Sequence, residues 1–382
     1  MIDNAFTGIF TTSGRAPREP ADPDVALWAA TLMPRGPRAA ELPVGGAGWT
    51  EEAAREAAHG EGVERFQPYP LPQDALLSSS FDRLGEPAVE PERWVLFHAA
   101  QYARPGFSFA PFTRSTPCRW AAFRRVPTGE LVWVPDEMAF LFLSGHRFAP
   151  GVSTGLSSGR PNHPVLLRGA QEVVERDAVV GAWWGRYALE EWRRDVDVRL
   201  ARPHLRWRFF RAATPYSAHA TIVTVEGGGL FGAGSAVRET REASWEKSSL
   251  EAAHALAYAR KLRAEMPAEE VDRLDSFAAH AAYYSLHPKR LASTPFASPA
   301  KPGGEAEVVE PLATLVARLG TSRPILYRLM TPPGLEDRLV LKVVIPGLQP
   351  LHGAEAFAHL GGPLWAPRGL AEWAACPPHP FA

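Results

Sequence analysis

The chain has 382 residues, a formal net charge of −1, 46% hydrophobic residues and 22% charged residues, which is the composition of a globular protein with a sizeable core. The near-neutral charge excludes an electrostatic case for binding nucleic acid or an anionic membrane surface. Cys118 and Cys376 form no CxxC pair, and we find neither a secretory signal nor an apolar run long enough to span a bilayer, so we expect a cytoplasmic protein.

The N-terminal region predicts short strands followed by a helix. Residues 1–48 are rich in Pro, Gly and Ala, and short strands such as TGIFTT alternate with loops there. We assign them to the same domain as residues 49–382. WTEEAAREAAHGEGVERF, residues 49–66, predicts a helix with Thr50 as its N-cap. Its two internal glycines each cost about 1 kcal/mol relative to Ala, so we expect them to permit close packing or to lie near a ligand.

The middle of the chain predicts a hairpin, a loop and a long helix, in that order. Residues 119–143 contain one strand before PTGE and a Val/Trp-rich strand after it. The segment STGLSSGRPNH, residues 153–163, predicts a Ser/Gly loop. It leads directly into a helix that we expect to run from about Pro164 to Arg194.

The remainder repeats the order of a Gly/Ser loop followed by an acidic helix. Two strands, LRWRFFRA and HATIVTVEG, precede the second loop, GGGLFGAGSAV, which spans residues 227–237. A second long helix is expected over residues 240–265. Residues 295–308 form a hydrophilic Pro/Gly segment that we expect to be a mobile loop. Residues 338–347 predict a buried strand, and the chain ends in the extended segment PPHPFA.

The candidate chemistry lies on three of the expected helices. Two of them carry the same ExxER spacing, and the third carries a Lys and a Glu four residues apart: Glu61, Glu64 and Arg65; Glu172, Glu175 and Arg176; Lys247 and Glu251. Residues at i and i+3 share one helical face, so the paired carboxylates point into the same space and repel each other. One such motif would be an ordinary solvated helix face. Because the second copy is flanked by Val and Trp, we expect a buried site for Mg²⁺ and phosphate groups.

The two Gly/Ser segments also suit anions, because loops ahead of helices present backbone N–H groups. GAGSAV is weak evidence for a dinucleotide site, and no GxxxxGK[ST] P-loop is present. The histidines are more typical of packing or surface positions than of ligands. A nucleotide site here would therefore have to be built from helix carboxylates.

The ordered series of motifs resembles the YcaO superfamily, and in particular the azoline-forming cyclodehydratases of ribosomal peptide natural-product (RiPP) biosynthesis. The segments that carry this resemblance are GEGVERF (60–66), LVWVPDEM (131–138), STGLSSG (153–159), GAQEVVERDAVVGAWW (169–184), FGAGSAVRETREASWEKSSLEAA (231–253), DSFAAHAAYYS (275–285), LVLKVVIPGLQPL (339–351) and PPHPF (377–381). They occur in the family's order and cover roughly residues 7–382.

The resemblance implies an α+β fold of two loosely similar halves, with mixed sheets and packed helices around a central site for ATP and Mg²⁺. The implied metal-site residues are Glu61, Glu64, Glu172, Glu175 and Glu251. The implied ATP contacts are Ser157, Arg176, Lys247, Glu64 and Arg65. Lys247 stands where the family usually has Arg.

Several positions depart from the family's pattern. Ala47 replaces the lysine of a Gly-Lys-Gly segment, and Arg160 stands where Asn is common. The start of the following helix, usually acidic, carries Pro161 and Pro164. Ala382 replaces the last proline of a PxPxP tail. Each departure bears on whether the ATP site is fully functional.

The activity implied by the resemblance is ATP-dependent cyclodehydration, in which a Cys, Ser or Thr side chain of a precursor peptide becomes a thiazoline or oxazoline, as in antibiotic peptide biosynthesis. No separate leader-binding domain is visible, so the implied partners are the precursor peptide and a ThiF-like leader-binding protein. An FMN-dependent azoline dehydrogenase often accompanies them, and a homodimer is left open. The alternatives are a YcaO enzyme that makes a thioamide or macroamidine, and a scaffold subunit that has lost ATP.

The C-terminal tail is apolar and carries three prolines, so docking it loses little conformational entropy. A dangling tail is usually polar and mobile. We therefore expect Pro378 and Pro380 to lie in a groove that leads to the ATP site, with the carboxylate of Ala382 near the reaction centre. The alternative is a disordered end with no role.

Overall fold

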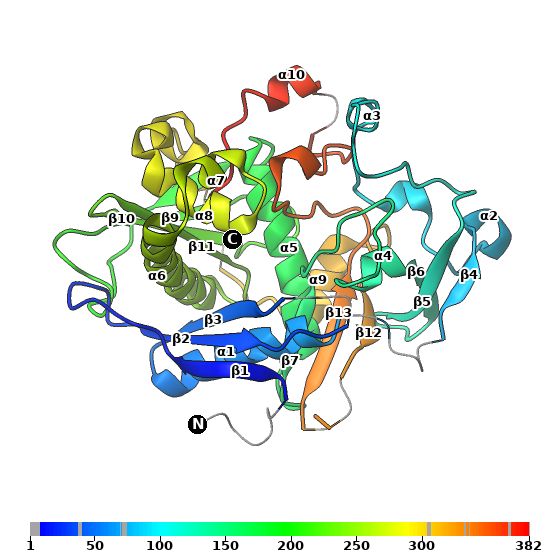
Figure 1. Ribbon diagram of the computed structural model, residues 1–382, viewed down its shortest axis with the longest axis horizontal. Helices are drawn as coiled ribbons and strands as arrows, with labels where there is room; N and C mark the ends of the chain where they lie inside the picture. The colour runs from blue at the N-terminus through cyan, green and yellow to red at the C-terminus, as the bar shows by residue number, and fades with distance from the viewer. Residues whose placement is uncertain are drawn as a thin grey trace.

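The computed structural model describes residues 8–36, 40–68, 70, 75–303, 307–331, 334–335, 337–365 and 368–381. Over these residues the chain has an α+β fold with three sheets, as expected, and every pair of named strands runs antiparallel (Figure 1). None of the helices in the described ranges is long and apolar enough to cross a membrane.

The N-terminal sheet has the order β1–β2–β3, with strands at Phe10–Arg15, Ala26–Leu32 and Leu42–Gly48. The second sheet has the order β11–β10–β9–β8, with strands at Leu230–Ala236, Thr221–Gly227, Arg206–Ala212 and Leu189–Trp192. The third has the order β4–β5–β12–β13–β7, with β6 also paired to β5. Its strands are Leu77–Ser79, Cys118–Arg125, Leu326–Leu329, Leu339–Val344, Leu156–Gly159 and, for β6, Leu131–Pro135.

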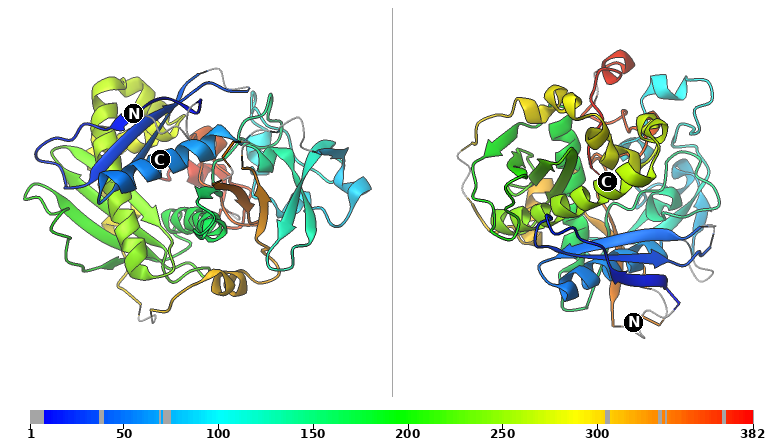
Figure 2. Two further views of the ribbon diagram at one scale, coloured as in Figure 1. Left: turned by 90° about the horizontal axis from the view of Figure 1, so that it is seen from below. Right: turned by 60° about the vertical axis from the view of Figure 1, so that its left-hand side comes forward.

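Three long helices organise the centre of the molecule: α1 (Glu51–Phe66), α5 (Val165–Trp183) and α6 (Arg241–Glu265). In the view from below, α5 lies in the middle, with α6 on one side and β13 on the other (Figure 2). The shorter helices are α2 (Phe81–Leu84), α3 (Ala99–Tyr102), α4 (Asp136–Ala139), α7 (Ala268–Arg273), α8 (Phe277–Leu286), α9 (Leu312–Leu319) and α10 (Leu370–Trp373). Single 3₁₀ turns occur at Pro91–Arg93, Pro295–Ala297 and Glu355–Phe357, and a longer one at Pro288–Ser293.

The expected N-cap of α1 is confirmed, and α6 has a cap of the same kind. The Thr50 side chain accepts a hydrogen bond from the N–H of Ala53, so α1 starts where the sequence predicts. Thr240 accepts one from Ala243 in the same way at the start of α6. The hairpin prediction is confirmed for β5 and β6, but the second strand ends at Pro135, because Asp136–Ala139 form the helical turn α4.

The expected helix from Pro164 to Arg194 is too long. The helix α5 ends at Trp183, and Gly185 then adopts a left-handed backbone angle of φ +67° that reverses the chain. Residues 189–192 form strand β8, which is hydrogen-bonded to β9. Tertiary pairing has therefore overridden the helical pattern beyond Trp184.

Both expected Gly/Ser loops contain a strand: a short one within residues 153–163, and one that makes up most of residues 227–237. Residues 156–159 form β7 and residues 230–236 form the fully buried strand β11. The glycines of β11 face α6, because a Cβ on Gly234 would lie 2.3 Å from the carbonyl oxygen of Ser248. A Cβ on Gly232 would lie 2.6 Å from the carbonyl oxygen of Ala252. Glycine is needed here for close packing of a helix on a sheet, and not for an anion-binding loop.

The expected mobile loop at residues 295–308 starts in a 3₁₀ turn, and Ala300 is hydrogen-bonded to β8 through Leu189 and Glu191. Residues 304–306 lie outside the described ranges. The expected buried strand near the C-terminus is confirmed as β13.

Candidate nucleotide and metal site

The carboxylates of α1 face backbone N–H groups of neighbouring strands. The N–H of Gly45 in β3 donates to Glu61 Oε2 at 3.1 Å, and the N–H of Ser158 in β7 donates to Glu64 Oε1 at 2.7 Å. Arg65 forms an ion pair with Glu61 at 2.7 Å. The close approach of α1 to β7 also explains Gly60, whose carbonyl oxygen accepts a 3.0 Å bond from the Ser158 hydroxyl.

The carboxylates of α5 have one backbone partner and one side-chain partner. The N–H of Gly155 donates to Glu172 Oε2 at 3.0 Å, and the Ser235 hydroxyl of β11 donates to Glu175 Oε1 at 2.7 Å. Arg176 lies between them, with its guanidinium nitrogens 3.8 Å from Glu172 Oε1 and 3.7 Å from Glu175 Oε1. This helix therefore connects the third sheet to β11 through its acidic face.

The carboxylate of α6 is surrounded by cations. Glu251 forms an ion pair with Lys247 one turn earlier on the same helix. Burial alone would raise the pKa of Glu251, but the charges of Lys247, His254 and Arg176 outweigh it and lower the pKa to about 2. Because Arg176 belongs to α5, the carboxylates of α5 and α6 share one cation.

The carboxylates of α1 and α5 repel each other. Burial and the charges of Glu172 and Glu61 together raise the pKa of Glu64 to about 8. Burial also raises the pKa of Glu172, against the opposing effect of Arg176. The structure thus brings the five predicted glutamates of three helices into one electrostatic cluster, which we call the acidic cluster: Glu61, Glu64, Glu172, Glu175 and Glu251.

Two cations near this cluster, the buried Lys342 and the half-buried Arg238, were not singled out by the sequence analysis. Lys342 in β13 donates to the carbonyl oxygens of Val152 and Thr154 at 2.9 and 2.8 Å. Burial lowers its pKa to about 8, against the opposing charge of Glu172. Burial likewise lowers the pKa of Arg238, which interacts electrostatically with Glu175. A lysine inside the otherwise apolar LVLKVV was the available signal for Lys342.

Ser157 is not directed at the carboxylates. Its hydroxyl donates to the carbonyl oxygen of Val165 at 3.0 Å and so attaches β7 to the start of α5. A Cβ on Gly169 would lie 2.8 Å from this hydroxyl, which confirms that Ser157 faces the helix. Ser158 is the serine that contacts the acidic cluster, and adjacent serines in a strand could not be told apart before the register was known.

The departures from the family's pattern differ in their surroundings. Ala47 is buried among hydrophobic residues that include Leu27 and Trp207. Arg160 and Pro164 are exposed, and Pro164 directly precedes the first residue of α5. Ala47 therefore lies in the core, whereas Arg160 and Pro164 share the exposed segment between β7 and α5.

The C-terminal tail lies inside the molecule. The Tyr284 hydroxyl of α8 donates to the carbonyl oxygen of Pro378 at 2.6 Å, and Pro380 and Phe381 are buried. Figure 1 shows this segment running from α10 toward the centre of the molecule, near α8 and α5. Ala382, the predicted terminal residue of the site, lies outside the described residues.

The tail also reaches the acidic cluster electrostatically. His379, between the two prolines, is buried, and the charge of Arg176 is one of the effects that lower the pKa of its imidazole, after burial, His280 and His352. His379 therefore lies within electrostatic range of Arg176, the cation between Glu172 and Glu175.

Residues 45–349 match the family described as YcaO cyclodehydratase, ATP- and Mg²⁺-binding. This match covers most of the chain, and the protein therefore belongs to the YcaO family, whose cofactors are ATP and Mg²⁺. No curated protein matches the chain.

Solved structures share the fold. A heterocyclase in complex with substrate and cofactor aligns with a TM-score of 0.73 and 19% identity over 98% of this chain and 55% of its own. This chain thus spans about half the length of that heterocyclase. YcaO from Methanopyrus kandleri, bound with AMPPCP and Mg²⁺, aligns with a TM-score of 0.63 and 18% identity over 90% of this chain and 87% of its own. The Escherichia coli microcin synthetase McbBCD complex with pro-MccB17 bound aligns with a TM-score of 0.66 and 13% identity over 100% of this chain and 99% of its own.

The acidic cluster fits a magnesium nucleotide on its own chemistry. Burial raises the pKa of Glu64 most, and the negative charges of Glu172 and Glu61 raise it further; a divalent cation would offset this repulsion. Oxygen ligands from carboxylates are what Mg²⁺ prefers, and it usually binds together with substrate phosphates. The cationic residues Arg176, Lys247 and Arg238 lie on the α5 and α6 side, where they suit phosphate oxygens.

Proposed function

We propose that this chain is an ATP-dependent cyclodehydratase subunit that makes thiazoline or oxazoline rings from Cys, Ser or Thr residues of a ribosomally made precursor peptide. The observation that carries this proposal is the acidic cluster of a member of the YcaO family, in which glutamates of three helices come together and those of α5 and α6 share Arg176. Cyclodehydration must turn an amide oxygen into a leaving group, and a site for Mg²⁺ and ATP beside a peptide-binding groove would achieve this.

The residues of the cluster take different roles in this proposal. Glu61, Glu64, Glu172, Glu175 and Glu251 would hold Mg²⁺, while Arg176 and Lys247 would bind phosphate oxygens. When bound, ATP supplies the phosphoryl group that is transferred to the oxygen of the hemiorthoamide, formed when the side-chain nucleophile adds to the preceding carbonyl carbon. Arg176 is poised to offset the charge that develops on that group, because it already lies between two carboxylates.

We assign Arg65 and Ser157 more distant positions. Arg65 forms an ion pair with Glu61 and would hold that carboxylate in place while the nucleotide binds. The Ser157 hydroxyl is occupied by Val165, so its contribution to nucleotide binding would be to fix the start of α5. Both residues then act on the site through a neighbour.

The tail would position the reacting groups. Pro378 and Pro380 keep the last residues extended, and Tyr284 fixes their path toward Arg176. We propose that the Ala382 carboxylate ends near the reaction centre, where it could accept the proton released as the ring forms. This role belongs to cyclodehydration and not to nucleotide binding.

The proposed partners are a precursor peptide and a ThiF-like protein that captures its leader, with an FMN-dependent azoline dehydrogenase as a further member. The similarity to the microcin synthetase complex with pro-MccB17 bound supports a peptide substrate and partner proteins. The proposed assembly acts in the cytoplasm, and it leaves a homodimer of this chain open.

Two measurements test the proposal. Titration of the chain with ATP analogues in the presence and absence of Mg²⁺ should show magnesium-dependent binding. An absence of binding would favour the alternative of a scaffold subunit that has lost ATP. Mass spectrometry of the precursor peptide encoded beside this chain, after incubation with the complete complex and ATP, should show loss of one water per ring. Exchange of oxygen for sulfur would identify a thioamide-forming enzyme instead. Loss of water that links the N-terminal amine to a backbone amide would identify a macroamidine.

A further inference from the structure

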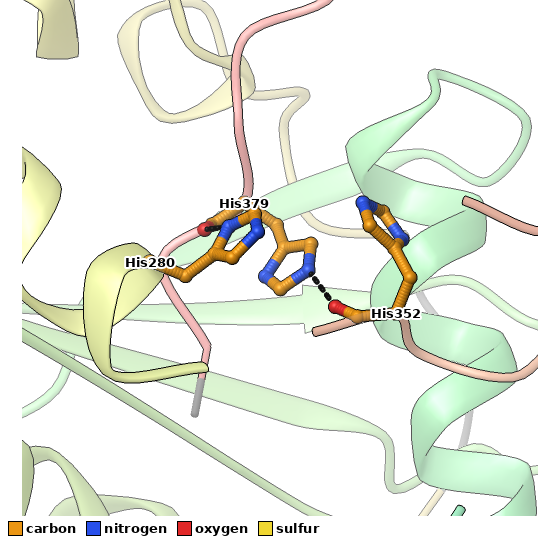
Figure 3. A group of neighbouring side chains, drawn as sticks. All are labelled: His280, His352 and His379. Carbon is orange, nitrogen blue, oxygen red and sulfur yellow. Dashed lines mark hydrogen bonds between the residues drawn. The ribbon is translucent and has the colours of Figure 1, made fainter. Parts of the chain in front are cut away.

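Three buried histidines from distant parts of the chain meet beside the tail (Figure 3). His280 lies on α8, His352 follows β13, and His379 belongs to the tail; their exposed fractions are 0%, 3% and 2%. One ring nitrogen of each lies within 4.8 Å of the others. We call this group the histidine cluster. The proposed cyclodehydration makes no use of it.

The hydrogen bonds of the histidine cluster fix two of its tautomers. His280 Nδ1 donates to the carbonyl oxygen of His379 at 2.8 Å, and His379 Nε2 donates to the carbonyl oxygen of His352 at 2.7 Å. A carbonyl oxygen can only accept, so the hydrogens are on these nitrogens and the lone pairs are on His280 Nε2 and His379 Nδ1. His379 Nδ1 accepts a long bond of 3.3 Å from the N–H of Phe381, which a metal would have to displace. His352 follows the same pattern, because its Nε2 lies 3.5 Å from the Glu355 carboxylate.

Two ring nitrogens of the cluster have no hydrogen-bond partner among the described residues: His280 Nε2 and His352 Nδ1. A buried polar atom without a partner is destabilising, so native structures rarely leave one. Here two such atoms occur in adjacent rings, although His280 Nε2 lies 3.9 Å from the Glu355 carboxylate, beyond hydrogen-bond distance. In each ring the other nitrogen is the one that donates to a carbonyl oxygen or lies closest to a carboxylate. The pattern is that of metal-binding histidines, whose second N–H commonly donates to a carbonyl or carboxylate oxygen.

We propose that His280, His352 and His379 bind one transition-metal ion of the zinc class, with the Glu355 carboxylate holding His352 in place. Neutral imidazoles suit zinc and its neighbours in the first transition row, and do not suit Mg²⁺, which prefers oxygen. Three histidines leave a fourth position for water, as in many three-ligand zinc sites. The rings of His280 and His379 are stacked at 4.0 Å, so one of them must tilt for both lone pairs to point at one metal.

The consequence is a cross-link between the tail and the body of the protein. The metal would join α8 and the segment after β13 to His379, whose neighbours Pro378 and Pro380 define the path of the tail. It would thereby fix the tail beside Arg176. The proposed metal site does not depend on the proposed reaction, because none of its ligands belongs to the acidic cluster.

The test is metal uptake by the full-length chain. Protein stripped with a chelator is titrated with Zn²⁺ in excess Mg²⁺, which occupies carboxylate sites, and the bound zinc is counted by elemental analysis. We expect one Zn²⁺ per chain and a rise in Tm on binding. His280→Gln and His352→Gln should each abolish uptake, and Glu355→Gln should weaken it about 10–100-fold, as is usual for groups that orient a ligand.

The matched control is His359→Gln. His359 is also buried, with 3% exposure and no partner for either ring nitrogen among the described residues, but it is not part of the histidine cluster. Zinc uptake should survive this change. Replacement of zinc by Co²⁺ in the unaltered protein should give the visible absorption of a four-coordinate site, which needs no variant to fold. No stoichiometric Zn²⁺ in the unaltered protein, or equal uptake by His280→Gln, would overturn the proposal.

Discussion

The two sides of the acidic cluster contain the same residue type in opposite electrostatic states. On the α1 side, Glu64 faces Glu172 and Glu61, and burial and these charges raise its pKa to about 8. On the α6 side, Glu251 faces Lys247, His254 and Arg176, which outweigh burial and lower its pKa to about 2. The charge of the neighbours, and not burial alone, decides the state of each carboxylate.

This difference suggests that the two sides of one nucleotide site bind different parts of a magnesium nucleotide. On the α1 side, Arg65 is paired with Glu61, while Glu64 faces two further carboxylates, so this side favours a divalent cation. The α6 side has cations that are only partly neutralised and so favours phosphate oxygens. Glu175 lies where the two sides meet, because it contacts Ser235 of β11 and is near Arg176.

The largest expected effect comes from removing the charge at this junction. Glu175→Gln should lower phosphate release by the complete complex about 10²–10³-fold, which is typical for loss of one preorganised electrostatic contact. The fold should survive, since glutamine can still accept the Ser235 hydroxyl bond and repulsion with Glu172 is relieved. The assay is phosphate release with the melting temperature measured in parallel.

The control for that variant is Glu265→Gln at the exposed end of α6, where the carboxylate is 62% exposed. It should leave phosphate release unchanged. Unaltered turnover in Glu175→Gln would show that the two sides do not meet at this residue.

Removal of the tail should separate the chemistry from nucleotide binding. Deleting residues 378–382 should cut azoline formation strongly while nucleotide affinity changes little, because the tail contacts Arg176 only electrostatically. The deletion also removes buried Phe381, so the melting temperature should fall. Deleting Ala382 alone keeps Phe381 and tests the position of the carboxylate. Full azoline formation by both deletions would show that the tail has no catalytic role.

The parts of this architecture that sequence could predict are those set by local chemistry. Thr50 and Thr240 locate the starts of α1 and α6, because each cap is a short-range hydrogen bond. The shared ExxER spacing indicates that the carboxylates of α1 and α5 belong together. The spacing does not predict which of the carboxylates lie next to cationic side chains.

The parts that sequence could not predict depend on long-range packing. The strand β11 resembles a loop because its glycines have low strand propensity, and only the contact with α6 explains them. Lys342 and Arg238 join the acidic cluster from β13 and from the segment between β11 and α6, and neither belongs to a helix that carries one of the glutamates. Their roles require the register of the sheets.

Each side of the site depends on a glycine that lets a helix approach a strand. A Cβ on Gly46 would lie 2.3 Å from the carbonyl oxygen of Ala54 in α1, and one on Gly234 would lie 2.3 Å from that of Ser248 in α6. Because backbone atoms cannot move aside, we expect Gly46→Ala and Gly234→Ala each to lower the free energy of unfolding by about 1–3 kcal/mol or more. Gly14→Ala is the control, since its Cβ would meet nothing within 4 Å. Denaturant unfolding would show whether one side tolerates the change.

The smallest expected effect is a change in melting temperature when Glu64 or Glu251 is replaced by glutamine. It tests the comparison most directly, because the two changes should have opposite signs. The pKa of Glu64 is raised in the folded state, so its contribution to stability is present below about pH 4.5 and is lost as the pH rises toward 8. The pKa of Glu251 is lowered, so its contribution is present above about pH 4.5 and is lost as the pH falls toward 2. Without Mg²⁺ at pH 8, Glu64→Gln should therefore raise the melting temperature and Glu251→Gln should lower it, each by about 1–3 °C for a chain of this size.

Added Mg²⁺ should reduce the rise in melting temperature caused by Glu64→Gln, since the cation offsets the same repulsion. Melting curves at pH 5 and pH 8 that shift in the same direction for both variants would show that the two sides share one electrostatic state.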